Sequence, residues 1–280
     1  MTPRELTGPT WPLQGVGLHG GRRQRLIIAP APVGQGRCFR RRRGATVATI
    51  PATLEAVQPA ARRTRLGQGA DTVDTVEHLL AACYVLGIAD AEFWLEGDEV
   101  PALDGSAAPF FDALLAASRP GGPAVRPWRV AGPAGLAQGA ARCQLAADES
   151  LDVVCAVELP GPPPVRQVVR YESALEAGSE APVFRRRFAP ARTFGWWSEA
   201  GTLRAAGLAR GASFANTLVL GSNGPWNGTE TRLVDEPARH KLVDALGDLA
   251  LLGAPLCGRL RLEACGHRGL VAMLRAARQS

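Results

Sequence analysis

The sequence predicts an α+β fold with two layers in each half. Three observations support this prediction. Strand-like segments precede a helix-like segment in each half, strands and helices do not alternate strictly, and residues 119–133 between the halves are rich in proline, glycine and arginine. Because this stretch has the composition of a linker, we expect an N-terminal domain over residues 1–122 and a C-terminal domain over residues 123–280.

The individual elements follow from local patterns. Short aliphatic runs bounded by proline or glycine predict strands, and apolar side chains spaced three and four residues apart predict helices. The first helix has an N-cap candidate in Asp74 or Thr75, and the longest helix ends before Gly253 and Pro255. In chain order we expect a glycine-rich turn (15–21), a strand (26–29), a strand or loop of four arginines (40–43), a helix (73–86), a strand (91–95), a turn (104–106), a helix (110–117), two strands (151–159 and 165–171), a glycine-rich region (around 194–220), a helix (240–252), a strand (260–263) and a short helix (271–277).

Composition excludes several classes of protein. Of the 280 residues, 46% are hydrophobic and 21% are charged, values typical of a globular chain and not of a disordered or fibrous one. We expect no transmembrane segment, because no apolar run approaches the roughly 18 residues that a span needs, and no signal peptide at the start of the chain. The six cysteines are scattered without a CxxC pair, so we expect no disulfide framework, no all-cysteine zinc site, and a reducing cytoplasm.

His240 and Asp244 are one turn apart on the same face of the helix expected over residues 240–252. An imidazole and a carboxylate at this spacing can bind one divalent metal ion, as in the HExxH arrangement. Asp248 follows one further turn along the same side. Such pairs are also common on solvated helix faces, so a metal site and a solvated pair both stay open from this spacing alone.

Glu77 and His78 are adjacent in an otherwise apolar helix. Burying both without partners would be costly, whereas a helix N-terminus at a cleft accommodates them. His78 would then be a third metal ligand, and three protein ligands with an open position are typical of catalytic zinc. Glu77 beside that position could take a proton from water at the metal. The alternative is a helix end whose two side chains are simply solvated.

Three further residues are candidates for chemistry. His267 lies in a glycine-containing turn, where it is either a general acid or base or an exposed turn histidine. Thr193 is either an oxyanion donor or the cap of a turn. Lys241 is the only lysine among 32 lysines and arginines, which indicates a position where a compact ammonium cannot be replaced by a guanidinium.

Ordered motifs span most of the chain, from Gly15 to about Leu274. They are residues 15–19 (GVGLH), 75–82 (TVEHLLAA), 101–110 (PALDGSAAPF), 191–195 (ARTFG), 207–213 (GLARGAS) with Asn216, 235–236 (DE), 239–249 (RHKLVDALGDL) and 266–267 (GH). Together they resemble the UDP-3-O-acyl-N-acetylglucosamine deacetylases, the zinc amidases of lipid A biosynthesis. The resemblance implies two similar α+β domains packed face to face, each with a small insert, and a hydrophobic acyl passage at the insert around residues 194–220.

The resemblance also implies a role for each site residue. The implied ligands of one zinc ion per chain are His78, His240 and Asp244. The implied catalytic residues are Glu77 as general base, His267 as general acid, Asp248 as the residue that orients His267, Thr193 as an oxyanion donor, and Lys241 near the metal. The implied substrate-binding residues are Leu18, His19, Phe194, Trp196, Trp197 and Lys241.

The implied reaction is hydrolysis of the N-acetyl group of an acylated UDP-amino-sugar, with release of acetate. A formal charge of +6 would attract this anionic substrate. We expect a cytoplasmic monomer without a nucleic-acid partner, because the arginine runs at residues 22–23, 40–43 and 185–187 lack interleaved aromatic residues. The alternatives are a zinc de-N-acylase for a related amino-sugar and a basic nucleic-acid-binding module.

The chain departs from the family pattern at a few positions near the site. Trp196 and Trp197 stand where less bulky apolar residues are usual, residues 268–270 (RGL) replace Ala-Leu-Asn, and Pro237 and Ala238 replace an aromatic–aliphatic pair. No catalytic group is lost. We expect the two tryptophans to narrow the passage and to favour shorter acyl chains.

Overall fold

The computed structural model describes residues 3–161, 163–173, 180–226 and 229–279. Its two main sheets share one strand order, with the last strand of each sheet in the centre: β2-β3-β9-β4-β5 and β12-β13-β19-β14-β15. The strands of the first sheet are β2 (Leu13–Val16), β3 (Arg23–Ala29), β4 (Arg37–Arg43), β5 (Thr46–Pro51) and β9 (Ala91–Glu96). Those of the second are β12 (Ala134–Gln138), β13 (Ala141–Ala146), β14 (Leu151–Leu159), β15 (Val165–Glu172) and β19 (Leu256–Glu263), with β11 (Trp128–Arg129) paired to β19.

The strand directions repeat as well. The central strand β9 runs antiparallel to β3 and parallel to β4. In the other sheet β19 runs antiparallel to β13 and parallel to β14. With the helices that lie between the sheets, this arrangement confirms the α+β class, while the division into domains at residue 122 stays a prediction.

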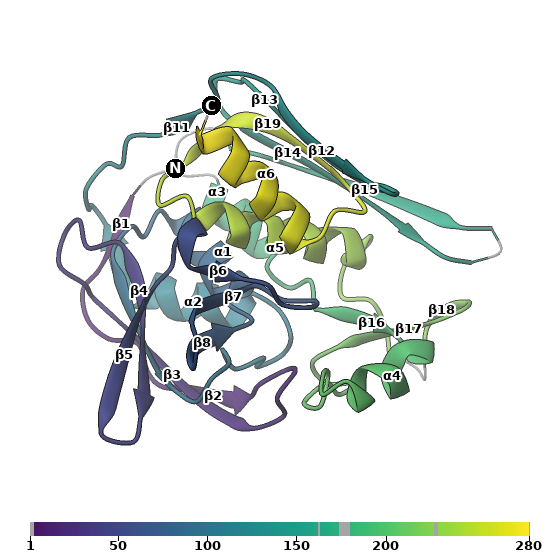
Figure 1. Ribbon diagram of the computed structural model, residues 1–280, viewed down its shortest axis with the longest axis horizontal. Helices are drawn as coiled ribbons and strands as arrows, with labels where there is room; N and C mark the ends of the chain where they lie inside the picture. The colour runs from purple at the N-terminus through teal and green to yellow at the C-terminus, as the bar shows by residue number, and fades with distance from the viewer. Residues whose placement is uncertain (1–2, 162, 174–179, 227–228, 280) are drawn as a thin grey trace.

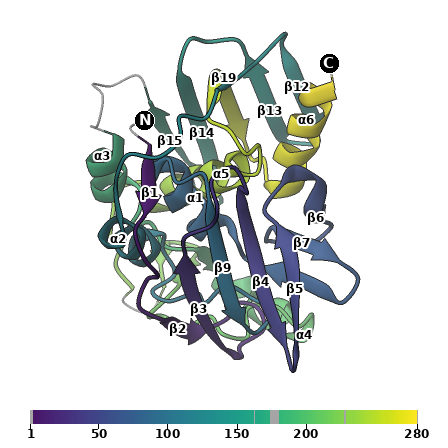
Figure 2. The same ribbon diagram turned by 90° about the vertical axis from the view of Figure 1, so that its left-hand side faces the viewer.

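Most of the helices lie between the two main sheets (Figures 1 and 2). They are α1 (Glu77–Leu86), α2 (Ala108–Ala116), α3 (Glu180–Arg187), α4 (Ala200–Ala205), α5 (Glu236–Ala250) and α6 (His267–Gln279), with short 3₁₀ turns η1 (Leu54–Ala56) and η2 (Trp197–Glu199). Among the residues described, no helix combines the length and the apolar composition that a membrane span needs.

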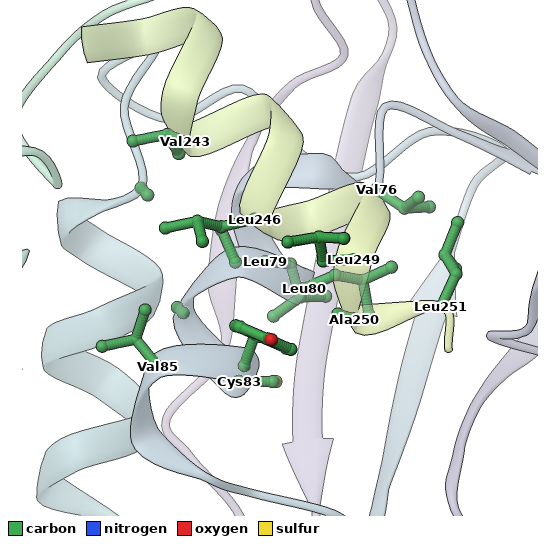
Figure 3. Close-up of a cluster of buried hydrophobic side chains, with 14 of the residues drawn as sticks. Val76, Leu79, Leu80, Cys83, Val85, Val243, Leu246, Leu249, Ala250 and Leu251 are labelled. Atoms are coloured by element: carbon green, nitrogen blue, oxygen red, sulfur yellow. The ribbon is translucent and has the colours of Figure 1, made fainter. Parts of the chain in front are cut away.

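The contact between α1 and α5 joins the two halves (Figure 3). Leu79, Leu80 and Cys83 of α1 are completely buried, as are Leu246 and Leu249 of α5. Burial of one such leucine stabilises the fold by about 1.5–3 kcal/mol. The first turn of α1 and the middle of α5 are therefore held against each other by a buried apolar interface.

Smaller sheets project from the two layers. The strands β6 (Val57–Gln58), β7 (Arg65–Gln68) and β8 (Asp71–Asp74) form one, and β16 (Phe194–Trp196), β17 (Leu218–Gly221) and β18 (Gly224–Pro225) form another. Helix α4 lies outside the two main sheets, beside the small β16-β17-β18 sheet (Figures 1 and 2). The pair β1 (Arg4–Leu6) and β10 (Ser118–Pro120) joins the chain start to the region expected as a linker. Most of the glycine-rich region around residues 194–220 is thus ordered by β16, η2, α4 and β17, which local patterns did not predict.

The expected strands are confirmed, but three helix starts differ from expectation by about one turn. Helix α1 starts at Glu77 and not near Asp74, because Asp74 belongs to β8 and Thr75 has a left-handed backbone (φ 60°). Helix α5 starts one turn early, at Glu236, and α6 already starts at His267. The observed start of α5 places Pro237 in the first turn, where proline is favoured, and His267 at the start of α6 is held by Asp248.

Candidate active site

Three potential metal ligands come together where α1 meets α5. His78 lies in the first turn of α1, and His240 and Asp244 are one turn apart on α5. One ligand atom from each lies within 4.8 Å of the other two. The Nε2 atoms of His78 and His240 are 3.5 and 3.3 Å from the Asp244 carboxylate oxygens. Two imidazoles and one carboxylate are a donor set that zinc prefers, and three protein ligands leave a coordination position open.

The protonation states of this cluster suit a metal. Burial lowers the pKa of His240 to about 3 despite the nearby Asp244 carboxylate, so its imidazole is neutral at pH 7. Burial alone would raise the pKa of Asp244, but the neighbouring His240 and Lys241 outweigh this effect and hold it well below its usual value. A neutral imidazole and an ionised carboxylate are the forms that bind metal ions.

Gly247 allows the helices to approach closely enough to form the cluster. A Cβ atom at this position would lie 2.2 Å from the carbonyl oxygen of Glu77 and 2.8 Å from its Cα atom. Since both are backbone atoms at the start of α1, no side-chain rotation could relieve the clash. Gly247 is not among the site residues expected from the sequence, although a glycine inside a helix, where it costs about 1 kcal/mol relative to alanine, is a signal.

Glu77 and His267 face each other beside the metal cluster. His267 Nε2 is 3.5 Å from Glu77 Oε1 and 3.8 Å from Asp244 Oδ2. The other ring nitrogen, Nδ1, is 2.8 Å from Asp248 Oδ2. Glu77 Oε1 accepts a hydrogen bond from the backbone N–H of Thr64, whereas its Oε2 atom is buried without a hydrogen-bond partner in the described part of the chain. The arrangement leaves Nε2 of His267 and Oε2 of Glu77 as the atoms available for proton transfer.

The electrostatics of this pair suit an acid and a base. Burial raises the pKa of Glu77 to about 7, an effect that the positive charge of His267 only partly offsets. Burial alone would lower the pKa of His267, but the charges of Asp248 and Glu77 and the hydrogen bond with Asp248 raise it to about 9. A carboxylate with a pKa near 7 is a suitable general base, and an imidazolium is a general acid.

Thr193 borders the same cavity. Its backbone N–H donates to Gly105 and its carbonyl accepts from Leu218, which fixes the residue just before β16. The preceding residue, Arg192, forms a buried ion pair with Glu236 at the start of α5, with Nε 2.9 Å from Oε1. This pair, which the sequence analysis missed, ties the Thr193 segment to the helix that carries His240.

Lys241 contacts the metal cluster directly. Its Nζ atom donates a 2.8 Å hydrogen bond to Asp244 Oδ2, and its side chain remains partly exposed. Burial would lower the pKa of Lys241, but the charge of Asp244 and this hydrogen bond raise it, so the group is an ammonium. The single lysine therefore lies at the site, as its rarity indicated.

Most of these groups border one cavity of about 650 Å³. Of the residues that the resemblance implied, those in the cavity wall are Glu77, His78, Thr193, His240, Lys241, Asp244 and His267, together with Leu18, His19, Phe194 and Trp196. Asp248 lies behind His267. Trp197 lies outside the wall: it is half exposed and stacks on Trp226, with ring centroids 5.5 Å apart. The cavity is therefore bordered by one of the two unusual tryptophans.

A disulfide lies in the same wall. Cys143 of β13 and Cys265, two residues before His267, are bonded to each other and both border the cavity. Cys38, Cys83, Cys155 and Cys257 are free. The scattered cysteines, from which we expected no disulfide framework, thus include a bonded pair, because β13 and the segment after β19 are brought together only by the sheet.

Comparison with known proteins identifies the family. The model of the UDP-3-O-acyl N-acetylglycosamine deacetylase family matches residues 9–278. The chain belongs to this family. It is 36% identical to the UDP-3-O-acyl-N-acetylglucosamine deacetylase of Myxococcus xanthus, over 91% of this chain and 80% of that protein. The proteins of the same name from Citrifermentans bemidjiense (35% identical, 95% and 86% covered) and Solibacter usitatus (37% identical, 90% and 83% covered) are similarly related.

Membership in the UDP-3-O-acyl N-acetylglycosamine deacetylase family confirms the resemblance found in the sequence. Each of the arginine runs, which suggested the alternative of nucleic-acid binding, contains at least one ion-paired arginine. The pairs are Arg22 with Asp98, Arg40 with Glu92, Arg43 with Asp71, and Arg185 with Asp112. The deacetylase family is a family of hydrolases that act on an amide bond.

Proposed function

We propose that this chain hydrolyses the N-acetyl group of a UDP-3-O-acyl-N-acetylglucosamine, a step of lipid A biosynthesis, with one zinc ion at His78, His240 and Asp244. The observation that carries the proposal is the position of Glu77 and His267, 3.5 Å apart, beside these three ligands in one cavity. When bound, zinc supplies Lewis acidity, which polarises the acetamide carbonyl and makes water a better nucleophile.

Glu77 is the general base in this proposal. Its Oε1 atom is occupied by the backbone N–H of Thr64, so the buried Oε2 atom takes the proton of the attacking water. The oxygen of the water forms a bond to the acetamide carbon. Charge then develops on the carbonyl oxygen, where the hydroxyl of Thr193 can donate a hydrogen bond.

His267 is the general acid. Asp248 holds Nδ1, which turns Nε2 into the cavity, and the raised pKa keeps the ring protonated at pH 7. Nε2 gives its proton to the amide nitrogen as the C–N bond breaks, so the sugar leaves as a neutral amine and acetate remains. Lys241 next to Asp244 supplies positive charge at the cavity wall, where the anionic substrate can contact it.

The acyl chain and the sugar require a larger surface. We assign them to Leu18, His19, Phe194 and Trp196, which border the same cavity. Trp197 lies outside the cavity wall, so we do not assign it to the substrate. The cytoplasmic location and the monomeric state stay predictions, which cell fractionation and light scattering can check.

The test is acetate release from a UDP-3-O-acyl-N-acetylglucosamine by the purified chain, before and after metal removal with a chelator and after return of zinc. We expect activity to be lost and restored with the metal. Glu77→Ala and His267→Ala should each lower kcat about 100-fold or more while zinc content stays at one ion per chain.

Substrates without the 3-O-acyl group separate this proposal from a de-N-acylase of another amino-sugar. A zinc-loaded chain that released no acetate from the acylated substrate would refute the proposed function. Full zinc content in His78→Ala would refute the ligand set.

A further inference from the structure

Thr64 connects the two residues proposed as acid and base. It lies immediately before β7, is almost completely buried, and does not border the cavity. Its backbone N–H donates to Glu77 Oε1, and its side-chain hydroxyl donates to Asp248 Oδ1 at 2.7 Å. A single residue next to the small β6-β7-β8 sheet thus contacts a carboxylate from each of the two central helices.

These contacts belong to a closed circuit of four residues, each of which contacts the next. Asp248 uses its second oxygen, Oδ2, to hold His267 Nδ1 at 2.8 Å, and His267 Nε2 is 3.5 Å from Glu77 Oε1. The circuit therefore runs from Thr64 through Asp248 and His267 to Glu77 and back to Thr64. Because the Thr64 hydroxyl occupies Oδ1, the Asp248 carboxylate cannot rotate freely, and the imidazole that it holds keeps one orientation.

The contacts of the Thr64 backbone can be separated experimentally from the contact of its hydroxyl. The structural part belongs to the backbone, since the Thr64 N–H contacts Glu77 and the Thr64 carbonyl accepts from the N–H of Thr75 at 3.0 Å. Within the described residues, the hydroxyl makes one hydrogen bond, to Asp248. A valine keeps the backbone and the branched shape, so it removes the donor alone.

We propose that Thr64 is a positioning residue for the deacetylation: its hydroxyl fixes the Asp248 carboxylate, and through it aims His267 at the leaving nitrogen. The inference rests on the proposed function. It predicts an effect on turnover and not on substrate binding, because Thr64 does not touch the cavity. It also predicts that the effect passes through Asp248.

The first experiment compares Thr64→Val, Thr64→Ser and the control Thr72→Val. Thr72 lies on β8 of the small β6-β7-β8 sheet, where it pairs with Gly67 of β7. We expect Thr64→Val to lower kcat about 10- to 100-fold, as outer-shell partners of metal sites do, with KM within about threefold and zinc content unchanged. Serine keeps the hydroxyl and should restore most of kcat, and the control should match the wild type. A wild-type kcat in Thr64→Val, or an equal loss in valine and serine, would overturn the inference.

The second experiment is a double-mutant cycle. In an Asp248→Asn background the valine substitution should cost less than about twofold, because the residue through which it acts is already changed. An unchanged penalty in that background would show that Thr64 acts by another route. If the wild-type chain itself released no acetate, the proposed function would have failed, and kinetics could not judge Thr64.

A spectroscopic measurement keeps the inference testable in that case. The Nδ1 proton of His267, between the ring and Asp248, should give a strongly deshielded resonance in the ¹⁵N-histidine-labelled chain, identified by its loss in His267→Ala. We expect Thr64→Val to shift or broaden this signal, and Thr64→Ser and Thr72→Val to leave it in place. An identical signal in Thr64→Val would overturn the inference whatever the activity.

Discussion

Replacement of Gly247 by alanine tests directly how the packing of α1 on α5 builds the metal site. The new Cβ atom would lie 2.2 Å from the Glu77 carbonyl oxygen, whereas Cβ atoms essentially never come closer than 3.0 Å to another heavy atom. The two helices must therefore separate locally by at least about 0.8 Å, the difference between these distances. The displaced carbonyl belongs to the residue just before His78, so the shift moves this ligand away from Asp244.

The expected loss of stability is moderate. Overpacking of a tight contact costs about 1–3 kcal/mol, and alanine recovers about 1 kcal/mol relative to glycine inside a helix. The free energy of unfolding of Gly247→Ala should therefore fall by about 2 kcal/mol or less, and the chain should still fold.

The expected loss of function is much larger. Metal sites tolerate deviations of only about 0.2 Å in ligand distances, and a displacement near 1 Å can cost about 100-fold in rate. We expect Gly247→Ala to bind zinc at least 10-fold more weakly in competition with a chelator and to lose about 100-fold in kcat/KM.

Gly201→Ala is the matched control. Gly201 also lies within a helix, α4, but a Cβ atom there would have nothing within 4 Å. This variant should keep wild-type zinc affinity and activity, with stability unchanged or slightly raised. Gly247→Ala with zinc affinity and kcat/KM within about threefold of wild type would refute the reasoning, because the helices would then have room for the methyl group.

Three further predictions concern the acid, the passage and the disulfide. Asp248→Asn removes a negative charge that raises the pKa of His267. Since the ring must be protonated to act as an acid, the alkaline limb of the kcat/KM–pH profile should move to lower pH. An alkaline limb at the wild-type pH would contradict this prediction. On a ladder of acyl lengths, where each accommodated methylene is worth about 0.8 kcal/mol or about fourfold, Trp196→Leu should move the optimum to longer chains. Trp197→Leu should leave the optimal acyl length in place. Equal shifts in the two variants would contradict the assignment of Trp196, and not Trp197, to the cavity wall. Reduction of the disulfide should lower the free energy of unfolding by about 2–4 kcal/mol in denaturant titrations, whereas six titratable thiols in the untreated protein would exclude the bond.

The sequence alone determined what depends on near neighbours in the chain. Helical periodicity placed His240, Asp244 and Asp248 along one side of a helix, because 3.6 residues per turn is a local property. The aliphatic runs at residues 151–159 and 165–171 predicted two strands of the second sheet for the same reason. The ordered motifs then identified the family before any contact between distant residues was visible.

Only the tertiary structure decided which distant residues meet. The pairing of β8 ended the expected extension of α1 toward Asp74, and the buried contact of α1 with α5 set the distance between His78 and Asp244. Thr64 reaches Asp248 across 184 residues, a contact that no spacing or propensity encodes. Periodicity and propensity act over a few residues, whereas the positions of the acid, the base and the metal ligands depend on how closely two buried helices and a small sheet pack together.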